Sequence, residues 1–354
     1  MSLRSVASPA NIGLLVVVVV LLILPGNVSD FFITNTLTET LILGLIAASI
    51  VFLTAQGGMI SLAQLLLAGV AGFMFGNAAS DSAARGLNLG WNPWMAVLFA
   101  LAVTTVVALV LGAVASRTTG IYFLMLTLVY GVIGVSVFAQ VVPISGPSGL
   151  SSIVAPDPFT DPYRRYHIAV ILSALTYLTL RGIARTNFGL SLQGVRDDPV
   201  RMSSLGFNVA LHRTLAFAIG GFFAGVGGVL NVWWRGQIDP TTISIGPTLI
   251  LLIIAVIGGI SHLEGAWLGA FVYVLLETYT TSIPLIDRIG LTPDRFNTII
   301  GLVVLLIMVL SPEGLMGILE RLRRGRGLAK PTEPTIEPPT TSHVSAESSP
   351  AQEP

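Results

Sequence analysis

The chain has 354 residues, of which 53% are hydrophobic and only 10% are charged, and its formal net charge is zero. A soluble domain usually carries about a quarter charged residues, whereas long apolar runs indicate membrane helices, because lipid offers the backbone no hydrogen-bond partner. We therefore predict an all-α polytopic membrane protein in contact with lipid, and the zero net charge argues against nucleic acid as a partner.

About ten apolar stretches follow one another along the chain, each close to the length of a membrane helix. The first, at 12–24, is the weakest, and we interpret it as a retained span because no small-x-small cleavage site follows it. The segment at 59–79 is rich in Gly and Ala, so that a broken or re-entrant helix is the alternative to a full span. The other stretches are at 35–55, 93–115, 120–143, 166–182, 212–232, 247–261, 265–283 and 296–311.

The distribution of Arg and Lys predicts the orientation in the membrane. With ten spans and a cytoplasmic N-terminus, twelve of the 18 basic residues fall inside and six outside. This ratio favours two cytoplasmic termini and places the polar segment at 181–213 in the cytoplasm. Residues 1–320 are then one transmembrane domain, and 327–354, rich in Pro, Ser, Thr and Glu, are predicted to be a disordered cytoplasmic tail.

A short helix is predicted inside the polar segment, within a loop at 186–208. Asp198 is a good N-cap, Pro199 suits the first helical position, and Gly206 can adopt the left-handed conformation that ends a helix. A capped helix between membrane spans suggests a docking element for another protein. The charged residues in and beside it are Arg196, Asp197, Asp198 and Arg201.

Polar residues inside or beside the spans are candidates for a transport path. Ser61 and Gln64 are the best placed to face an interior pathway, although hydrogen bonds between helices explain them equally well. The loop that contains Gly146, Ser148 and Gly149 is either a structural turn or an outer gate for substrate, and the sequence favours neither.

The glycines and the acidic residues of the spans can be explained by helix packing and ion pairing, without a role in a transport path. The glycines between Gly220 and Gly228 favour close packing of helices over a pore lining. Glu39 and Glu277 fall near the outer ends of their spans, where ion pairing is the simpler interpretation. Gly57-Gly58 and Gly258-Gly259 each precede a helix of small residues, which is either an internal repeat or chance.

No catalytic constellation is present in the sequence. The four histidines have no ligand spacing, and the absence of cysteine excludes thiolate metal sites and disulfides. No G-x-x-x-x-G-K-[ST] sequence occurs, so the chain has no phosphate loop of its own for ATP. We therefore predict a protein that is not an enzyme and has no cofactor or metal of its own.

Short segments in a particular order and spacing extend over about residues 35–318. They include Arg117-Thr118-Thr119-Gly120-Ile121-Tyr122, Gly146-Pro147-Ser148-Gly149-Leu150, Val195-Arg196-Asp197-Asp198-Pro199, Gly265-Ala266-Trp267-Leu268-Gly269-Ala270 and Ser311-Pro312-Glu313-Gly314-Leu315. Together they resemble the permease subunit of branched-chain amino acid ABC importers, of the M type. The chain departs from that family at Ala63-Gln64, where Gly-His is common, and in its long tail.

The resemblance implies an ATP-driven importer in the plasma (inner) membrane of a prokaryote, for branched-chain or related amino acids. Its partners would be a sister permease that completes the path, two cytoplasmic ATP-binding subunits and an extracytoplasmic substrate-binding protein. The short helix would couple the chain to an ATPase through Arg196, Asp197, Asp198, Pro199, Arg201 and Gly206. The alternatives are a permease for a sugar, nucleoside or urea-like amide, and an ion-coupled secondary transporter.

Overall fold

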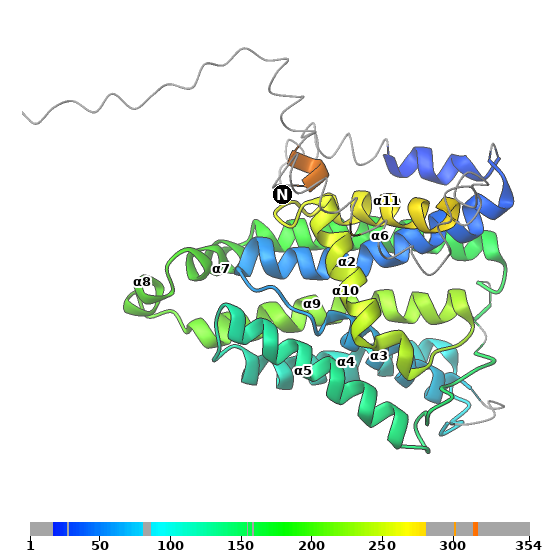
Figure 1. Ribbon diagram of the computed structural model, residues 1–354, viewed down its shortest axis with the longest axis horizontal. Coiled ribbons are helices and arrows are strands. Elements are labelled where there is room, and N and C mark those ends of the chain that lie inside the picture. Colours follow the sequence, from blue (N-terminus) through cyan, green and yellow to red (C-terminus); the bar gives the residue numbers. More distant parts are fainter. Residues whose placement is uncertain are drawn as a thin grey trace, which may run out of the picture.

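Helices make up nearly all the regular structure of the protein (Figure 1). The computed structural model describes residues 17–26, 28–80, 86–153, 155–157, 159–280, 301 and 314–317. Within these residues the only β pairing is an isolated bridge between Leu150 and Ile238, so the predicted all-α class is confirmed. The elements are η2 (Leu24–Gly26), η3 (Phe32–Leu37), α2 (Thr38–Gly57), α3 (Gln64–Ala79), α4 (Pro93–Ala115), α5 (Ile121–Gln140), α6 (Pro162–Ala184), α7 (Asn187–Asp197), α8 (Pro199–Ser204), α9 (Val209–Arg235), η4 (Pro240–Ile243), α10 (Ile245–Gly258) and α11 (Gly265–Thr280).

Five helices in the described residues are long and apolar enough to cross a membrane: η3 with α2, and then α4, α5, α6 and α9. The apolar helices α3, α10 and α11 are shorter, and the 16 residues of α3 extend only about 24 Å, less than the hydrocarbon core of a bilayer. The count of ten spans is not confirmed, because residues 12–16 of the first stretch and all of 296–311 except residue 301 lie outside the described residues. The predicted tail at 327–354 lies outside them as well.

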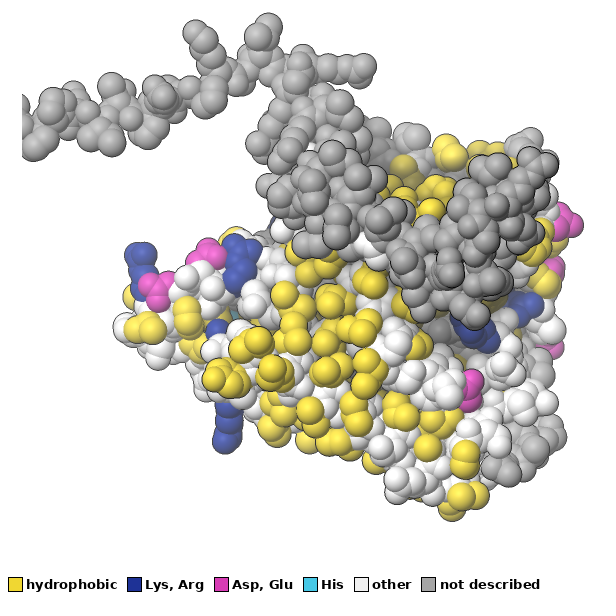
Figure 2. All heavy atoms as spheres, in the orientation of Figure 1, with side chains coloured by type: hydrophobic (Ala, Val, Ile, Leu, Met, Phe, Trp, Pro, Cys, Tyr) yellow, Lys and Arg dark blue, Asp and Glu magenta, His cyan; other side chains and the backbone are white. Residues whose placement is uncertain are grey.

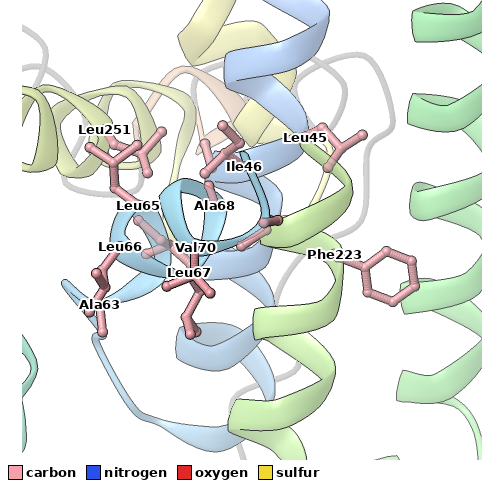
Figure 3. Packing of buried hydrophobic residues seen from close by; sticks show 14 of the residues in the cluster. Leu45, Ile46, Ala63, Leu65, Leu66, Leu67, Ala68, Val70, Phe223 and Leu251 are labelled. Carbon is pink, nitrogen blue, oxygen red and sulfur yellow. The ribbon is translucent and has the colours of Figure 1, made fainter. Parts of the chain in front are cut away.

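Helix α3 lies at the centre of the bundle, against α2, α4 and α9 (Figures 1 and 3). All its residues except Met74 and Ala79 are buried. Apolar side chains point outward from the helix in every direction and pack against the surrounding helices. Figure 3 shows this arrangement, with Leu45 and Ile46 of α2 and Leu251 of α10 around it. Other helices enclose this short helix on all sides, and this enclosure accounts for the absence of a polar face on it.

The glycines of α9 allow that close approach. A Cβ atom built on Gly228 would lie 1.9 Å from the carbonyl oxygen of Ala68, and one on Gly221 would lie 2.5 Å from the Cβ of Ala108. The backbones of α9 and α3 therefore meet at a distance that leaves no room for a side chain on Gly228, and Gly221 leaves room for the Ala108 side chain of α4. The prediction of close packing at these glycines is confirmed.

The segment at 59–79 is not helical throughout. Helix α2 ends at Gly57, Gly58 is left-handed with φ +64°, and the next helix begins only at Gln64. The link between them is held by α5, because the Leu62 amide donates to the Thr127 hydroxyl at 3.1 Å. The segment is therefore helical only from Gln64 to Ala79, and whether it crosses the membrane stays a prediction.

The same succession of elements occurs a second time. Helix α10 ends at Gly258, Gly259 has φ +112°, and α11 begins at Gly265. Both α3 and α11 have 16 residues, and the link before each has the same length. The glycine pairs noticed in the sequence therefore mark equivalent breaks between a helix and a following short helix.

Apolar side chains cover the middle of the face in Figure 2, and the charged side chains visible there lie toward the two ends. Helices α4 and α5 provide much of the exposed apolar surface, for example Leu98, Met95 and Ile121. An apolar band between two charged ends is the surface that a lipid bilayer requires.

Candidate functional site

The predicted short helix is present as α8, at the tip of the molecule in Figure 1. The carboxylate of Asp198 accepts a hydrogen bond from the Arg201 amide at 2.9 Å, which caps the first turn. Pro199 is the first helical residue, and Gly206 has φ +89°. The caps inferred from sequence therefore delimit this helix as expected.

None of the residues of α8 is buried, although Pro199 and Met202 are partly covered and Met202 lies against Gly194 of α7. Val200 is 75% exposed, Leu205 is 66% exposed and Phe207, just beyond it, is 42% exposed. These apolar side chains lie beside Asp197, Asp198 and Arg201 at the charged end of the molecule. Exposed apolar side chains within a charged tip are typical of a docking surface.

Helix α7 connects this tip to the core of the bundle. Arg196 donates to the carbonyl oxygen of Ala55 near the end of α2, and it forms a salt bridge of 2.8 Å with Asp197. Gln193 donates to the side-chain oxygen of Gln56 at 2.6 Å. Within the part of the chain that the structure describes, Arg201 forms no salt bridge. Of the predicted coupling residues, Arg196 thus contacts the bundle and Arg201 faces outward.

Ser61 and Gln64, the residues predicted for the translocation path, are fully buried around the start of α3. The Ser61 hydroxyl accepts from the amide of Ala63 at 3.2 Å, which shapes the link before α3. Neither the oxygen nor the nitrogen of the Gln64 amide has a hydrogen-bond partner among the described residues. The chain's own helices enclose both side chains, so neither is open to a path in this state.

The loop with Gly146, Ser148 and Gly149 packs against the segment that follows α9. Gly146 and Gly149 both have φ +71°, and a Cβ atom on Gly149 would lie 2.2 Å from the carbonyl oxygen of Ile238. Leu150 and Ile238 exchange backbone hydrogen bonds of 2.7 and 2.9 Å. The turn is therefore a structural feature, and a gating role for it stays a prediction.

Two interactions join the spans near their ends. Arg235, at the end of α9, forms a salt bridge of 3.2 Å with Glu39 of α2, so the predicted pairing of Glu39 is confirmed. Glu264, in the link before α11, accepts a hydrogen bond from Tyr177 and lies 3.8 Å from Arg181. The link before α11 is thereby attached to α6.

A cavity of about 220 Å³ lies at the end of the bundle that carries α8. The link after α2, the turn between α4 and α5, and Arg213 of α9 line it. Our sequence reasoning did not identify this site, although Arg213 is the only charged residue in the apolar run at 212–232. Elsewhere, the described residues contain no group of three or more His, Asp or Glu that could hold a metal ion.

The known proteins to which the chain is similar are permease proteins of transport systems. The chain is 23% identical over 286 residues to the high-affinity branched-chain amino acid transport system permease protein LivM of Salmonella typhimurium, and 23% identical over 301 residues to LivM of Escherichia coli. These alignments cover 73% and 77% of this chain, but only 65% and 68% of those relatives. The fructose import permease protein FruF of Bifidobacterium longum is 24% identical over 71% of each chain.

No solved structure matches the chain at a significant level. The family model described as "Branched-chain amino acid transport system / permease component" matches residues 32–310, which include every span from η3 to α11. Its members are transport permeases, and five long apolar helices suit that description. The chain therefore belongs to the family of branched-chain amino acid transport system permease components.

Proposed function

We propose that this chain is the membrane-spanning permease subunit of an ATP-driven importer for branched-chain or related amino acids. The observation that carries the proposal is the exposed, doubly capped helix α8 in a chain of this family. A permease without a phosphate loop needs a separate ATPase, and a rigid helix at the tip of the bundle suits contact with one.

The contact with the ATPase would use the apolar residues of the tip. Val200, Leu205 and Phe207 are exposed, and burial of such side chains in a cleft of a partner is the main favourable term in association. Asp198 and Gly206 fix the ends of the helix, so that it moves as one body. Arg196 and Gln193 then transmit that motion to the end of α2.

The complete importer would include a sister permease, two ATP-binding subunits and an extracytoplasmic binding protein. In this arrangement α8 faces the cytoplasm, both termini lie on the same side, and the membrane is the plasma (inner) membrane of a prokaryote. The path forms between the two permeases, and Ser61 and Gln64 join it in a state in which the helices around α3 have moved apart.

Uptake into proteoliposomes that contain the full importer tests the substrate. We expect ATP-dependent uptake of radiolabelled leucine that excess isoleucine and valine inhibit, whereas excess fructose leaves it unchanged. Omission of ATP is the matched control. An ion-coupled transporter would still accumulate leucine without ATP, because an imposed ion gradient would drive the uptake. ATP-independent accumulation would contradict the proposal.

A sugar permease is the second candidate, since the fructose import permease of Bifidobacterium longum is similar over 71% of this chain. That alternative predicts the opposite pattern in the same assay, with fructose uptake that leucine does not inhibit. If a nucleoside or a urea-like amide is the substrate, neither labelled leucine nor labelled fructose should be taken up.

A further inference from the structure

The loop before α4, at the end of the molecule opposite α8, presents a group of exposed apolar side chains. They come from the loop itself and from the first turn of α4, and even the least exposed of them, Trp91, is 41% exposed. Exposed apolar side chains that gather in one place mark an interaction surface. We call this group the 87–95 surface, and its members are Leu87, Leu89, Trp91, Trp94 and Met95.

The 87–95 surface continues directly into an apolar stripe along α4. Exposed residues recur there every three or four positions, so they lie on one face of the helix, and the opposite face packs against α3 and α9. The stripe consists of Met95, Leu98, Ala102, Val106, Val110 and Val114. The 23 residues of α4 extend about 34 Å, close to the thickness of about 30 Å of the hydrocarbon core. This face therefore has the composition and the length of a surface covered by lipid chains.

The two ends of the stripe have the side chains that membrane interfaces favour. Arg117 is exposed just beyond the last turn of α4, where a long basic side chain reaches the headgroups. The other end carries Trp91 and Trp94, and Trp is enriched at membrane interfaces because its ring is apolar and its N–H is polar. No charged residue occurs between Arg85 and Arg117, so this stretch offers a protein partner no ion pair.

Hydrogen bonds attach this loop to the end of α3. The Leu89 amide donates to the carbonyl oxygen of Asn77 at 3.2 Å, and the Trp91 amide donates to that of Ala78 at 2.9 Å. The side-chain oxygen of Asn77 also accepts from the Leu87 amide at 2.8 Å. The loop and the last turn of α3 therefore form one rigid unit.

We propose that the 87–95 surface lies in the phospholipid headgroup layer of the leaflet opposite α8 and holds the end of α3 at the membrane surface. The inference goes beyond the proposed function and does not depend on the molecule that is transported. Because α3 extends only about 24 Å, its start at Gln64 then lies inside the hydrocarbon layer.

Fluorescence quenching of the full-length chain in nanodiscs tests the position of the loop. The chain has no cysteine, so that Leu87→Cys gives one site for a nitrobenzoxadiazole dye. The nanodiscs contain phosphatidylcholine that carries a nitroxide either beside the headgroup or near the end of an acyl chain. We expect the shallow nitroxide to remove most of the fluorescence of this dye and the deep nitroxide to remove little of it.

Two further single-cysteine variants are the controls. Val106→Cys places the dye near the middle of α4, on the exposed stripe, and the deep nitroxide should quench it more than the shallow one. Val200→Cys places it on an equally apolar and exposed residue of α8, and neither nitroxide should quench it strongly. Equal melting temperatures of the three variants would establish that each one folds.

The outcomes decide between lipid and other partners of the surface. If the dye at Val106 is quenched but neither nitroxide quenches the dye at Leu87, the proposal is overturned, and the surface faces water or another protein. Stronger quenching at Leu87 by the deep nitroxide would also overturn it, because the loop would then lie below the headgroups. Neither result affects the proposed function, since the measurement involves no ATP and no transported substrate.

Discussion

Gly228 shows how a single residue determines the packing of the bundle. It lies where α9 crosses α3, and a Cβ atom there would meet the backbone oxygen of Ala68 at 1.9 Å. A backbone atom cannot rotate away as the end of a side chain can, so the two helices would have to separate. The centre of the bundle therefore depends on the absence of a side chain at this position.

Gly228→Ala should lower the melting temperature of the purified chain markedly, since overpacking costs about 1–3 kcal/mol or more. Gly182→Ala is the matched control, because nothing lies within 4 Å of a Cβ atom built on this glycine of α6. That control should be neutral or slightly stabilising, as Ala favours a helix more than Gly does. Equal melting temperatures of the two variants would show that α9 and α3 can move apart freely.

At the scale of elements, the boundaries of α8 were predictable and the start of α3 was not. Asp198, Pro199 and Gly206 are local signals, and each acts on the residues next to it. The link before α3 is instead held by Thr127, which lies far along the chain. Its apolar composition is compatible with either a helix or an extended segment, so that only the tertiary contact decides.

The cavity could not be predicted from the sequence, because contacts between distant parts of the chain form it. Gly58, Thr119 and Arg213 come from three separate parts of the chain, and no spacing in the sequence joins them. The resemblance to the permease family identified the class, and the family match confirms it. Which polar residues are enclosed, such as Gln64, depends on how the helices pack, and hydropathy carries no such information.

The double variant Asp198→Ala with Gly206→Val tests α8 as a unit. Loss of the cap and of the left-handed residue should fray the helix, at about 1 kcal/mol for the cap alone. We expect the reconstituted importer to hydrolyse ATP without uptake of leucine, while membrane insertion is unchanged. Asn92→Ala with Gly90→Val removes a cap and a left-handed glycine at the opposite end, before α4, and should leave coupling intact. Uptake at the wild-type level in the α8 variant would exclude its coupling role.

On the face of the molecule that Figure 2 shows, the charged side chains lie toward two ends and apolar side chains lie between them. The tip with α7 and α8 carries several basic residues, among them Arg185, Arg196 and Arg201. An excess of Arg and Lys favours the cytoplasmic side of a membrane. These basic residues belong to the count from which the orientation was predicted, and the orientation itself stays a prediction.

The absence of cysteine makes this orientation directly measurable. A single cysteine at exposed Ser203 of α8 should react with a membrane-impermeant maleimide only in inside-out vesicles. A single cysteine at exposed Leu89, before α4 at the opposite end, should react only from outside. The wild-type chain, which cannot be labelled, is the control. Labelling of both positions from the same side would contradict the orientation.

Arg196 has a consequence for the energetics of the whole transport cycle. It joins α7 to the end of α2, and its Cγ lies 2.6 Å from where a Cβ atom of Gly58 would be, at the wall of the cavity. A displacement of α8 that moves Arg196 would therefore reach the wall of the cavity, and the coupling free energy between two sites is the same in both directions. A molecule that binds in this cavity would accordingly alter the affinity of α8 for whatever partner docks on it.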